Sequence, residues 1–396
     1  MLAACTVGSD APGGEPADLG PDAGAATADD PDAATAAPPE PDPGDPADPD
    51  DPGDPGDDSA PADPQAGTTD ALGLWHPRAF TATRFAVFYQ VGRDVLATYA
   101  DPETGLPHAP HHAYIISISH ASVGADRATA DRIHDARDDF FYAPAFDLNN
   151  HPGWATASDA QLRTMAHAFR DEALAAHADL WSFNEAPTTT AGSPSQRRAM
   201  IKLVRYLADP NAAGTRLRGV FYLTHKPSMP SSWTSHAPDF WAALDETTVA
   251  VVAEHYHGQS WVCGNSEAAI ADHLFALRRW LASSGDPHQV RIANQKFTVL
   301  HSSRYADGPS GWEGADARTT TLAQFQHALS KLTRVTRNTD GGKNRISFAP
   351  MASSITDPRV QPRITLLLRW HYGAASQAAT GELPCVAGAA VNCTCQ

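Results

Sequence analysis

The feature that most constrains the fold is a regular alternation of short apolar runs and helical patterns after about residue 80. Eight runs rich in aromatic, β-branched and other apolar residues stand at 84–92, 113–124, 140–148, 179–187, 218–227, 248–258, 290–300 and 345–354. Continuous apolar runs of this length are typical of strands covered on both faces, as in parallel sheets. The run at 140–148 is the weakest, because Pro144 interrupts it.

Helical periodicity occupies much of the sequence between these runs. Apolar residues recur on one helical face at 159–177, 195–209, 266–282 and 321–336. Strands that alternate with helices form a parallel sheet, and eight such units favour a closed barrel over an open, doubly wound sheet. No GxGxxG or GxxxxGK[ST] follows any run, which removes the commonest reason for the open alternative. We predict an α/β chain with a single (β/α)8 TIM barrel.

The first 70 residues have a different composition. They consist mostly of Pro, Ala, Asp and Gly, and they contain 18 acidic residues and no Lys or Arg. Such a segment has too little apolar surface to offset the entropy of ordering it, so a long, disordered acidic tail is predicted before the barrel. The expected organisation is a short signal remnant at 1–5, a linker at 6–72 and the barrel domain at 73–396.

The tail explains the negative charge of the chain. Removing its 18 acidic residues from the chain's 46 leaves 28, against 29 Lys and Arg. A nearly neutral domain lacks the basic surface typical of nucleic-acid binding, so no nucleic-acid partner is expected. No apolar run approaches the roughly 20 residues needed to cross a bilayer. We expect a monomer.

The N-terminal sequence Leu2-Ala3-Ala4-Cys5 resembles the bacterial lipobox. This resemblance implies that Cys5 becomes the lipidated first residue of an exported protein, held by its lipid at the cell surface or in the periplasm, or else secreted. The apolar leader that such a signal needs is not present, so we expect translation to start further upstream. Four other cysteines would allow two disulfides in an oxidising compartment, with the pairing open: Cys263, Cys385, Cys393 and Cys395.

Polar residues gather where the apolar runs end. In a parallel barrel these carboxyl ends meet at one mouth, where the chemistry of this fold is located. For any single residue a turn or cap role is the commoner explanation, but six such ends coincide here. The polar residues are Gln90, His120, Asn184, Glu185, His225, Lys226, Glu254, His255, Tyr256 and Gln295.

The pair Asn184-Glu185 resembles the Asn-Glu that ends the fourth barrel strand of clan A glycoside hydrolases. On that resemblance Glu185 is the general acid/base and Asn184 binds the sugar hydroxyl next to the reacting carbon. His120, Gln90, His225, Lys226, His255, Tyr256 and Gln295 would then hold sugar hydroxyls or steer the acids. Aromatic residues that could form a sugar platform are Trp154, Trp181, Trp233, Tyr256, Trp261 and Trp312, of which Trp181 shares a strand face with Glu185 by simple alternation.

The second carboxylate departs from the family pattern. The clan's nucleophile is a Glu on the seventh strand, where this sequence has Gln295 and Lys296. The best alternative is Glu254 on the sixth run. Two explanations stay open: the strands are miscounted at the weak third run, or the paired acids use strands four and six. Glu254 is therefore expected to act as nucleophile or base.

Other chemistries fit the sequence less well. His255 and His257 are two residues apart and the chain has 18 histidines, so a metal-dependent hydrolase is an alternative. There is no GxSxG elbow and no Cys beside a plausible His partner. We expect no cofactor and no metal, and a hydrolase that cleaves glycosidic bonds in an oligo- or polysaccharide. A non-catalytic barrel that binds surface glycans is the other alternative.

Overall fold

A computed structural model describes residues 67–71, 73–82, 84–89, 100, 112–118, 126–186, 194–224, 233, 238–255, 259–302, 331–332, 334–336 and 338–349. The chain divides into two compact units, 1–59 and 60–396, and every described residue belongs to the second. The predicted signal remnant and nearly all of the predicted linker therefore lie outside the described residues.

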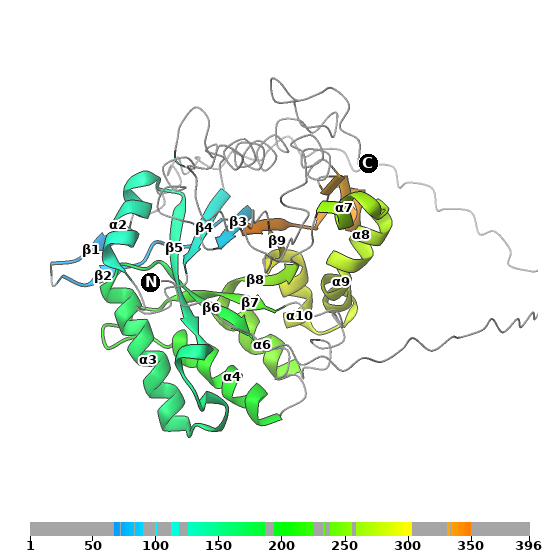
Figure 1. Cartoon of the computed structure of the whole chain (residues 1–396). Helices are drawn as coiled ribbons and strands as arrows, with labels where there is room; N and C mark the ends of the chain where they lie inside the picture. Colours follow the sequence, from blue (N-terminus) through cyan, green and yellow to red (C-terminus); the bar gives the residue numbers. More distant parts are fainter. Residues whose placement is uncertain are drawn as a thin grey trace, which may run out of the picture. The chain divides into compact units, whose positions relative to one another are not determined.

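Eight parallel strands close into a barrel in the order β10-β3-β4-β5-β6-β7-β8-β9. They are β3 (Arg84–Tyr89), β4 (His112–Ile118), β5 (Phe140–Asp147), β6 (Leu180–Ala186), β7 (Arg218–Leu223), β8 (Thr248–His255), β9 (Phe297–Ser302) and β10 (Ile346–Ala349). Every predicted run overlaps one of these strands, including the run with Pro144 (Figure 1). The predicted (β/α)8 fold is confirmed, and the strand count on which the site depends was correct.

Helices lie outside the strands, as Figure 1 shows. They are α2 (Arg127–Ala136), α3 (Asp159–Ala175), α4 (Pro194–Leu207), α6 (Pro238–Thr247), α7 (Gln259–Gly264), α8 (Glu267–Leu274), α9 (Ala276–Ser283) and α10 (Pro287–Arg291), with short 3₁₀ turns η1 (Leu148–Asn150), η2 (Trp154–Thr156) and η5 (Asp340–Gly342). The predicted helix at 266–282 is split into α8 and α9 at Phe275, and Ser266 caps its start by accepting from the backbone N–H of Ala269. No helix in the described part of the chain is long and apolar enough to cross a membrane.

The alternation of side chains along each strand creates two apolar layers. Phe85, Val87, Leu180 and Val252 belong to the layer inside the barrel. The residues next to them along the strands, such as Trp181, join the layer between strands and helices. Because successive side chains of a strand point to opposite faces, layer membership shows whether a strand residue faces the interior or the helices.

The barrel closes between β10 and β3. Within the described residues their ladder consists of the pair Phe348↔Phe88. Ser347, a buried residue, accepts the backbone N–H of Val87 at 3.0 Å and lies 2.9 Å from the hydroxyl of Thr298. This side chain satisfies a strand N–H at the point where the ladder is short.

The seventh barrel strand begins later than predicted. The run at 290–300 was expected to be a strand, but α10 and a π-helical turn, η4 (Ile292–Lys296), occupy its first part and β9 begins at Phe297. Asp286 caps α10 by accepting from the N–H groups of His288 and Gln289, and Pro287 follows it at the first helical position. This Asp-Pro pair is a helix-start signal that competes with the apolar content of the run.

A short antiparallel hairpin, β1 (Thr68–Thr69) and β2 (Trp75–His76), precedes the barrel. Trp75 is 9% exposed, donates from Nε1 to the carbonyl of Ala178 at 2.9 Å, and stacks on the rings of His134 and His177. The predicted linker ended at residue 72, so its last residues belong to this hairpin. Folded structure in the described chain starts at Gly67.

Arg78, just after the hairpin, is clamped at the amino end of the barrel. Its guanidinium bonds both oxygens of Asp179, at 3.0 Å from Nε and 2.7 Å from Nη2, and it also donates to the carbonyls of Asp138 and Phe140. Phe140 is the first residue of β5 and Asp138 lies two residues before it, while Asp179 lies immediately before β6. The segment therefore joins these two strands at the end opposite their carboxyl termini.

Candidate functional site

Acidic residues occupy the carboxyl ends of three barrel strands. Glu185 is the last residue but one of β6, Glu254 is the last but one of β8, and Asp147 is the last residue of β5. Because the strands are parallel, these positions fall at the same end of the barrel. The two glutamates that were paired from sequence therefore lie at the same end of the barrel, on the fourth and sixth barrel strands, with β7 between them.

The end of β6 contains an irregularity that the sequence pattern did not indicate. Its register against β7 shifts between Phe183 and Ala186. Trp181, Phe183 and Ala186 all belong to the helix-facing layer, so the alternation of faces is broken between 183 and 186. The expectation that Glu185 shares the face of Trp181 and Phe183 rested on unbroken alternation, so it stays an untested prediction. The backbone of Glu185 is described, but its side chain is not.

Asn184 is buried, with 5% of its surface exposed, and it pairs with a carboxylate on the neighbouring strand. Asp147 and Asn184 are register partners, and Nδ2 of Asn184 donates to Oδ2 of Asp147 at 3.4 Å. The other oxygen of Asp147 accepts the backbone N–H of Asn149 at 2.8 Å. The sequence reasoning missed Asp147, although it is a carboxylate at the end of an apolar run, which is the signal that selected Glu185 and Glu254.

Glu254 lies on the interior face of β8. It has 1% of its surface exposed, and it shares its face with Ala250 and Val252, which belong to the interior apolar layer. Its register partner on β9 is Leu300, another interior residue. The carboxylate of Glu254 is therefore surrounded by the strands of the barrel, near the carboxyl end of β8.

His255 faces away from the barrel interior, contrary to the expected sugar-binding role. It is 2% exposed, and its ring lies 5.4 Å from that of His273 on α8, which in turn contacts Trp261 on α7. Alternation explains this placement, because the neighbouring Glu254 faces inward. Burial lowers the pKa of His273. His255 therefore belongs to the contact between β8 and the helices.

Two further residues predicted for the mouth lie elsewhere. Gln295 is exposed in η4, before β9 begins, and so lies toward the amino end of the barrel. Trp181 is the second residue of β6 and fully buried, and its Nε1 donates to the carbonyl of Leu217 at 3.3 Å. Trp181 fills the space left by Gly219 on β7. Neither residue is placed to touch a ligand at the mouth.

The remaining predicted site residues cannot be located in the same way. Gln90, His120, His225, Lys226, Tyr256, Cys5, Cys385, Cys393 and Cys395 lie outside the described residues. Cys263 takes part in a disulfide, but its pairing stays a prediction because the other cysteines are not described. Within the described part of the chain, no group of three or more His, Cys, Asp or Glu side chains is arranged to hold a metal ion.

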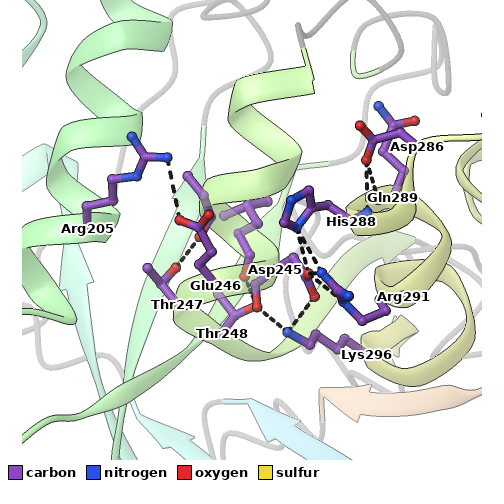
Figure 2. Close-up of polar contacts among 12 residues, drawn as sticks. Arg205, Asp245, Glu246, Thr247, Thr248, Asp286, His288, Gln289, Arg291 and Lys296 are labelled. Atoms are coloured by element: carbon purple, nitrogen blue, oxygen red, sulfur yellow. Dashed lines mark hydrogen bonds and ion pairs between the residues drawn. The ribbon is translucent and has the colours of Figure 1, made fainter.

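A second cluster of charges lies at the amino end of the barrel, where Figure 2 shows it around Asp245 on α6. The carboxylate of Asp245 contacts Arg291 at 2.7 Å, Lys296 at 2.8 Å and His288 at 2.9 Å. Burial alone would raise the pKa of Asp245, but the hydrogen bonds from these three residues outweigh it and the pKa is lowered. Burial lowers the pKa of Lys296, although Asp245 opposes this. The cluster joins α6, α10 and η4 away from the mouth.

Comparisons with known proteins give no family. No protein-family model matches the sequence, and no curated protein matches it. Among solved structures, a GH18 chitinase from Pseudoalteromonas aurantia is 8% identical, with a TM-score of 0.44, over 71% of this chain and 98% of that one. A triosephosphate isomerase from Bartonella henselae is 8% identical, with a TM-score of 0.34, over 72% and 98% of the two chains. An amidohydrolase from Burkholderia multivorans is 17% identical, with a TM-score of 0.33, over 75% and 96%. These low values assign no activity to this chain.

Proposed function

We propose that this chain is a glycoside hydrolase that acts on an oligo- or polysaccharide. The observation that supports it is the position of Glu185 and Glu254 as the last residues but one of β6 and β8, at one end of the barrel. Asn184, which precedes Glu185, is buried on the interior face beside Asp147. Most glycosidases use a pair of carboxyl groups that flank the glycosidic bond to be cleaved.

The spacing of the strands suits this role. One strand separates β6 from β8, so their backbones are about 10 Å apart at a strand spacing of about 4.8 Å. Two glutamate side chains that reach toward each other from such positions leave room for a sugar ring between them. Carboxyl separations of about 5 Å accompany retention of the anomeric configuration, and about 6.5–9.5 Å accompany inversion.

In the proposed reaction Glu185 gives its proton to the leaving glycosidic oxygen as the bond to the anomeric carbon breaks. Glu254 attacks that carbon in a retaining enzyme, and water then releases the sugar while Glu185 takes back a proton. In an inverting enzyme Glu254 instead removes a proton from the water that attacks. The anomeric configuration of the first product, followed by NMR, decides between the two roles of Glu254.

The proposal is tested by turnover on a panel of glycosides with wild type, Glu185→Gln and Glu254→Gln. General acid–base catalysis contributes about 10² to 10⁴ in rate, so each variant should lose at least about 100-fold in kcat. The matched control is Glu246→Gln, an exposed glutamate on α6 that pairs with Arg205 at 3.5 Å. Melting temperatures measured alongside separate loss of chemistry from loss of folding.

Two results would contradict the proposal. One is full activity in both site variants at unchanged melting temperature. The other is a wild type that binds glycans but turns over none of them, which is the behaviour of a glycan-binding barrel. In that case substitution of aromatic residues at the mouth, and not of the glutamates, would reduce binding.

We also propose that the protein is exported and anchored through Cys5, on the sequence resemblance alone. When the chain is expressed behind a lipoprotein signal sequence, Cys5→Ser should move the protein from the membrane fraction to the soluble fraction. Unchanged partitioning would refute lipidation at this residue and leave the proposed hydrolase unaffected.

A further inference from the structure

One side chain of the β1–β2 hairpin, Trp75, connects it to two histidines at the amino end of the barrel. The indole ring lies 4.4 Å from the ring of His177, at an angle of 9°, and 5.2 Å from the ring of His134, at an angle of 12°. His134 belongs to α2, beside which the hairpin lies in Figure 1. Trp75 is buried, whereas the other strand residues of the hairpin are exposed. The packing of the hairpin on the barrel therefore depends on this stack.

His177 occupies a backbone position that histidine rarely takes. It follows Ala176, the C-cap of α3, and its φ of 61° is left-handed. Its N–H donates to the carbonyl of Leu174 at 3.0 Å, and the N–H of Ala178 donates to that of Ala173 at 2.9 Å. These two bonds form a Schellman motif, in which Gly is the usual left-handed residue and Asn the next. A histidine here has a conformational cost that a contact elsewhere must offset.

The same motif presents both a ring and a carbonyl to Trp75. The ring of His177 stacks on the indole, and the carbonyl of Ala178, the next residue, accepts from Nε1 of Trp75 at 2.9 Å. Glycine or asparagine would keep the motif and the carbonyl but lose the stacked ring. The histidine therefore serves the contact with the hairpin, and it places there a group that can titrate near neutral pH.

Burial opposes the protonation of His177 in this contact. The residue is 7% exposed, and its Nδ1 lies 3.8 Å from Oδ1 of Asp131, which already binds Nε of Arg127 at 3.0 Å. Burial lowers the pKa of His177, and Arg127 and His134 lower it further. Asp131 and Asp179 act on this pKa in the opposite direction but are outweighed. A protonated His177 is therefore disfavoured while the hairpin covers it.

Other charged groups around this contact are paired with one another. The pairs are Asp179 with Arg78 and with His134, His76 with Asp70 on the hairpin, and Arg170 with Asp171 on α3. The carboxylates of Asp131 and Asp179 are thus each shared with an arginine. They compensate a charge on His177 only in part.

We propose that the stack of Trp75 on His177 is a pH-dependent latch, which holds the hairpin on the barrel at neutral pH and releases it in mild acid. A histidine that is harder to protonate in the latched state than in the released state contributes stability above its ordinary pKa of 6.5. That stability is lost as the pH falls below this value. The proposal does not rest on the glycosidase function, and it concerns the end of the barrel opposite Glu254.

The clamp between Arg78 and Asp179 limits how far the release extends. The pKa of Asp179 is lowered, so its carboxylate stays ionised through the range in which His177 gains its proton. Arg78 therefore remains bound while the segment from Gly67 to Pro77 leaves the barrel. The expected acid form is a folded barrel with a detached hairpin.

Hydrogen exchange of the full chain, followed by mass spectrometry, measures the latch. A peptide that covers residues 67–78 reports on the hairpin and one that covers β7 reports on the barrel, and protection factors correct for the intrinsic effect of pH on exchange. A histidine that stays neutral when latched and has its ordinary pKa when released lowers the protection of the hairpin by up to about 30-fold from pH 7.5 to 5.0. We expect a loss of at least about fivefold, with β7 better protected than the hairpin at both pH values.

The decisive variants are His177→Asn and His177→Gly, which suit the left-handed backbone and remove the titrating ring. In both, the protection of the hairpin should be lower at pH 7.5 and should change by less than about twofold between pH 7.5 and 5.0. His76→Gln removes an exposed histidine of the same hairpin and is the matched control, which should keep the wild-type pH dependence. His134→Gln should lower protection at both pH values and keep most of that dependence.

Several results would overturn the latch. One is a wild-type hairpin whose protection is unchanged or rises in acid; a rise would mean that the protonated ring binds the indole face as a cation. Another is a pH dependence that persists in His177→Asn and His177→Gly, or that disappears in His134→Gln or His76→Gln. Equal protection of the hairpin and β7 at both pH values would show that the hairpin opens only when the barrel unfolds.

Discussion

Removal of the Asp179 carboxylate should be among the most damaging single changes at the amino end of the barrel. The side chain of Asp179 is fully buried and that of its partner Arg78 is 8% exposed. Asp179 also contacts His134 at 2.8 Å and accepts the backbone N–H of Tyr142 at 3.0 Å. Asp179→Ala leaves a buried guanidinium and a buried N–H without this acceptor.

The magnitude follows from these contacts. Breaking a buried ion pair by removing one partner costs about 3–5 kcal/mol. Arg78 still donates to the carbonyls of Asp138 and Phe140, which softens the loss, while the N–H of Tyr142 adds to it. We expect the free energy of unfolding to fall by about 3–5 kcal/mol. At about 2 °C per kcal/mol for a large domain, this corresponds to a melting temperature about 6–10 °C lower.

The effect depends on pH in a defined direction. Burial alone would raise the pKa of Asp179, but the hydrogen bonds and charges of His134 and Arg78 outweigh it, and the pKa is lowered in the folded protein. A lowered pKa contributes stability that is present above the unfolded-state value of about 3.9 and is lost as the pH falls through the folded-state pKa. The difference in the free energy of unfolding between wild type and Asp179→Ala should therefore be constant from pH 7 to about 5. Below about pH 4 this difference should become smaller.

Urea denaturation followed by tryptophan fluorescence at several pH values measures this gap. Glu246→Ala is the control, because its ion pair with Arg205 is about half exposed and such pairs contribute about 0–1 kcal/mol. A loss below about 1 kcal/mol in Asp179→Ala at pH 7, or a gap that widens in acid, would refute the assignment of Asp179 as a buried, ionised partner of Arg78.

Three further changes test the packing described above. Gly219→Ala should lower the free energy of unfolding by about 1–3 kcal/mol, because a Cβ at this position would overlap the ring of Trp181. Gly264→Ala is the control: a Cβ there has no atom within contact distance, so the change in stability should be less than about 1 kcal/mol. Ser158→Ala should cost about 1 kcal/mol by removing the capping box of α3, and equal stability in urea would refute that cap. Trp75→Ala should cost about 3–5 kcal/mol, and a melting temperature equal to that of wild type would show that the hairpin contributes nothing to the barrel.

Much of the fold could be predicted because it depends on local patterns. Continuous apolar runs located every barrel strand, and the start of the predicted helix at 266–282 agrees with the N-cap of α8 at Ser266. The main error, at Gln295, arose from weighing apolar content above the Asp286-Pro287 helix start. The sequence contained that signal, and a search for caps inside each apolar run would have moved Gln295 away from the mouth.

The site was less predictable because it depends on register and on strand faces. Glu254 lies on the interior face of β8, and simple alternation along the strand then turns His255 toward the helices, which the sequence reasoning did not take into account. The register shift at the end of β6 depends on how that strand pairs with β7. This pairing could not be predicted from the pattern of residues in one sequence. The contact between Asp147 and Asn184 likewise requires knowing which residues of two strands stand side by side.

The clamp formed by Arg78 has a mechanical consequence for the far end of the barrel. Arg78 ties the start of β5 to the residue before β6, and these are the two strands whose other ends carry Asp147 and Asn184. Sliding one strand past the other by a single residue would move it by about 3.3 Å and turn alternate side chains to the opposite face. The hydrogen bonds of Arg78 oppose this shear. A force that pulls on the chain before Gly67 would therefore have to break the contacts of Arg78 before it could change the spacing of Asp147 and Asn184.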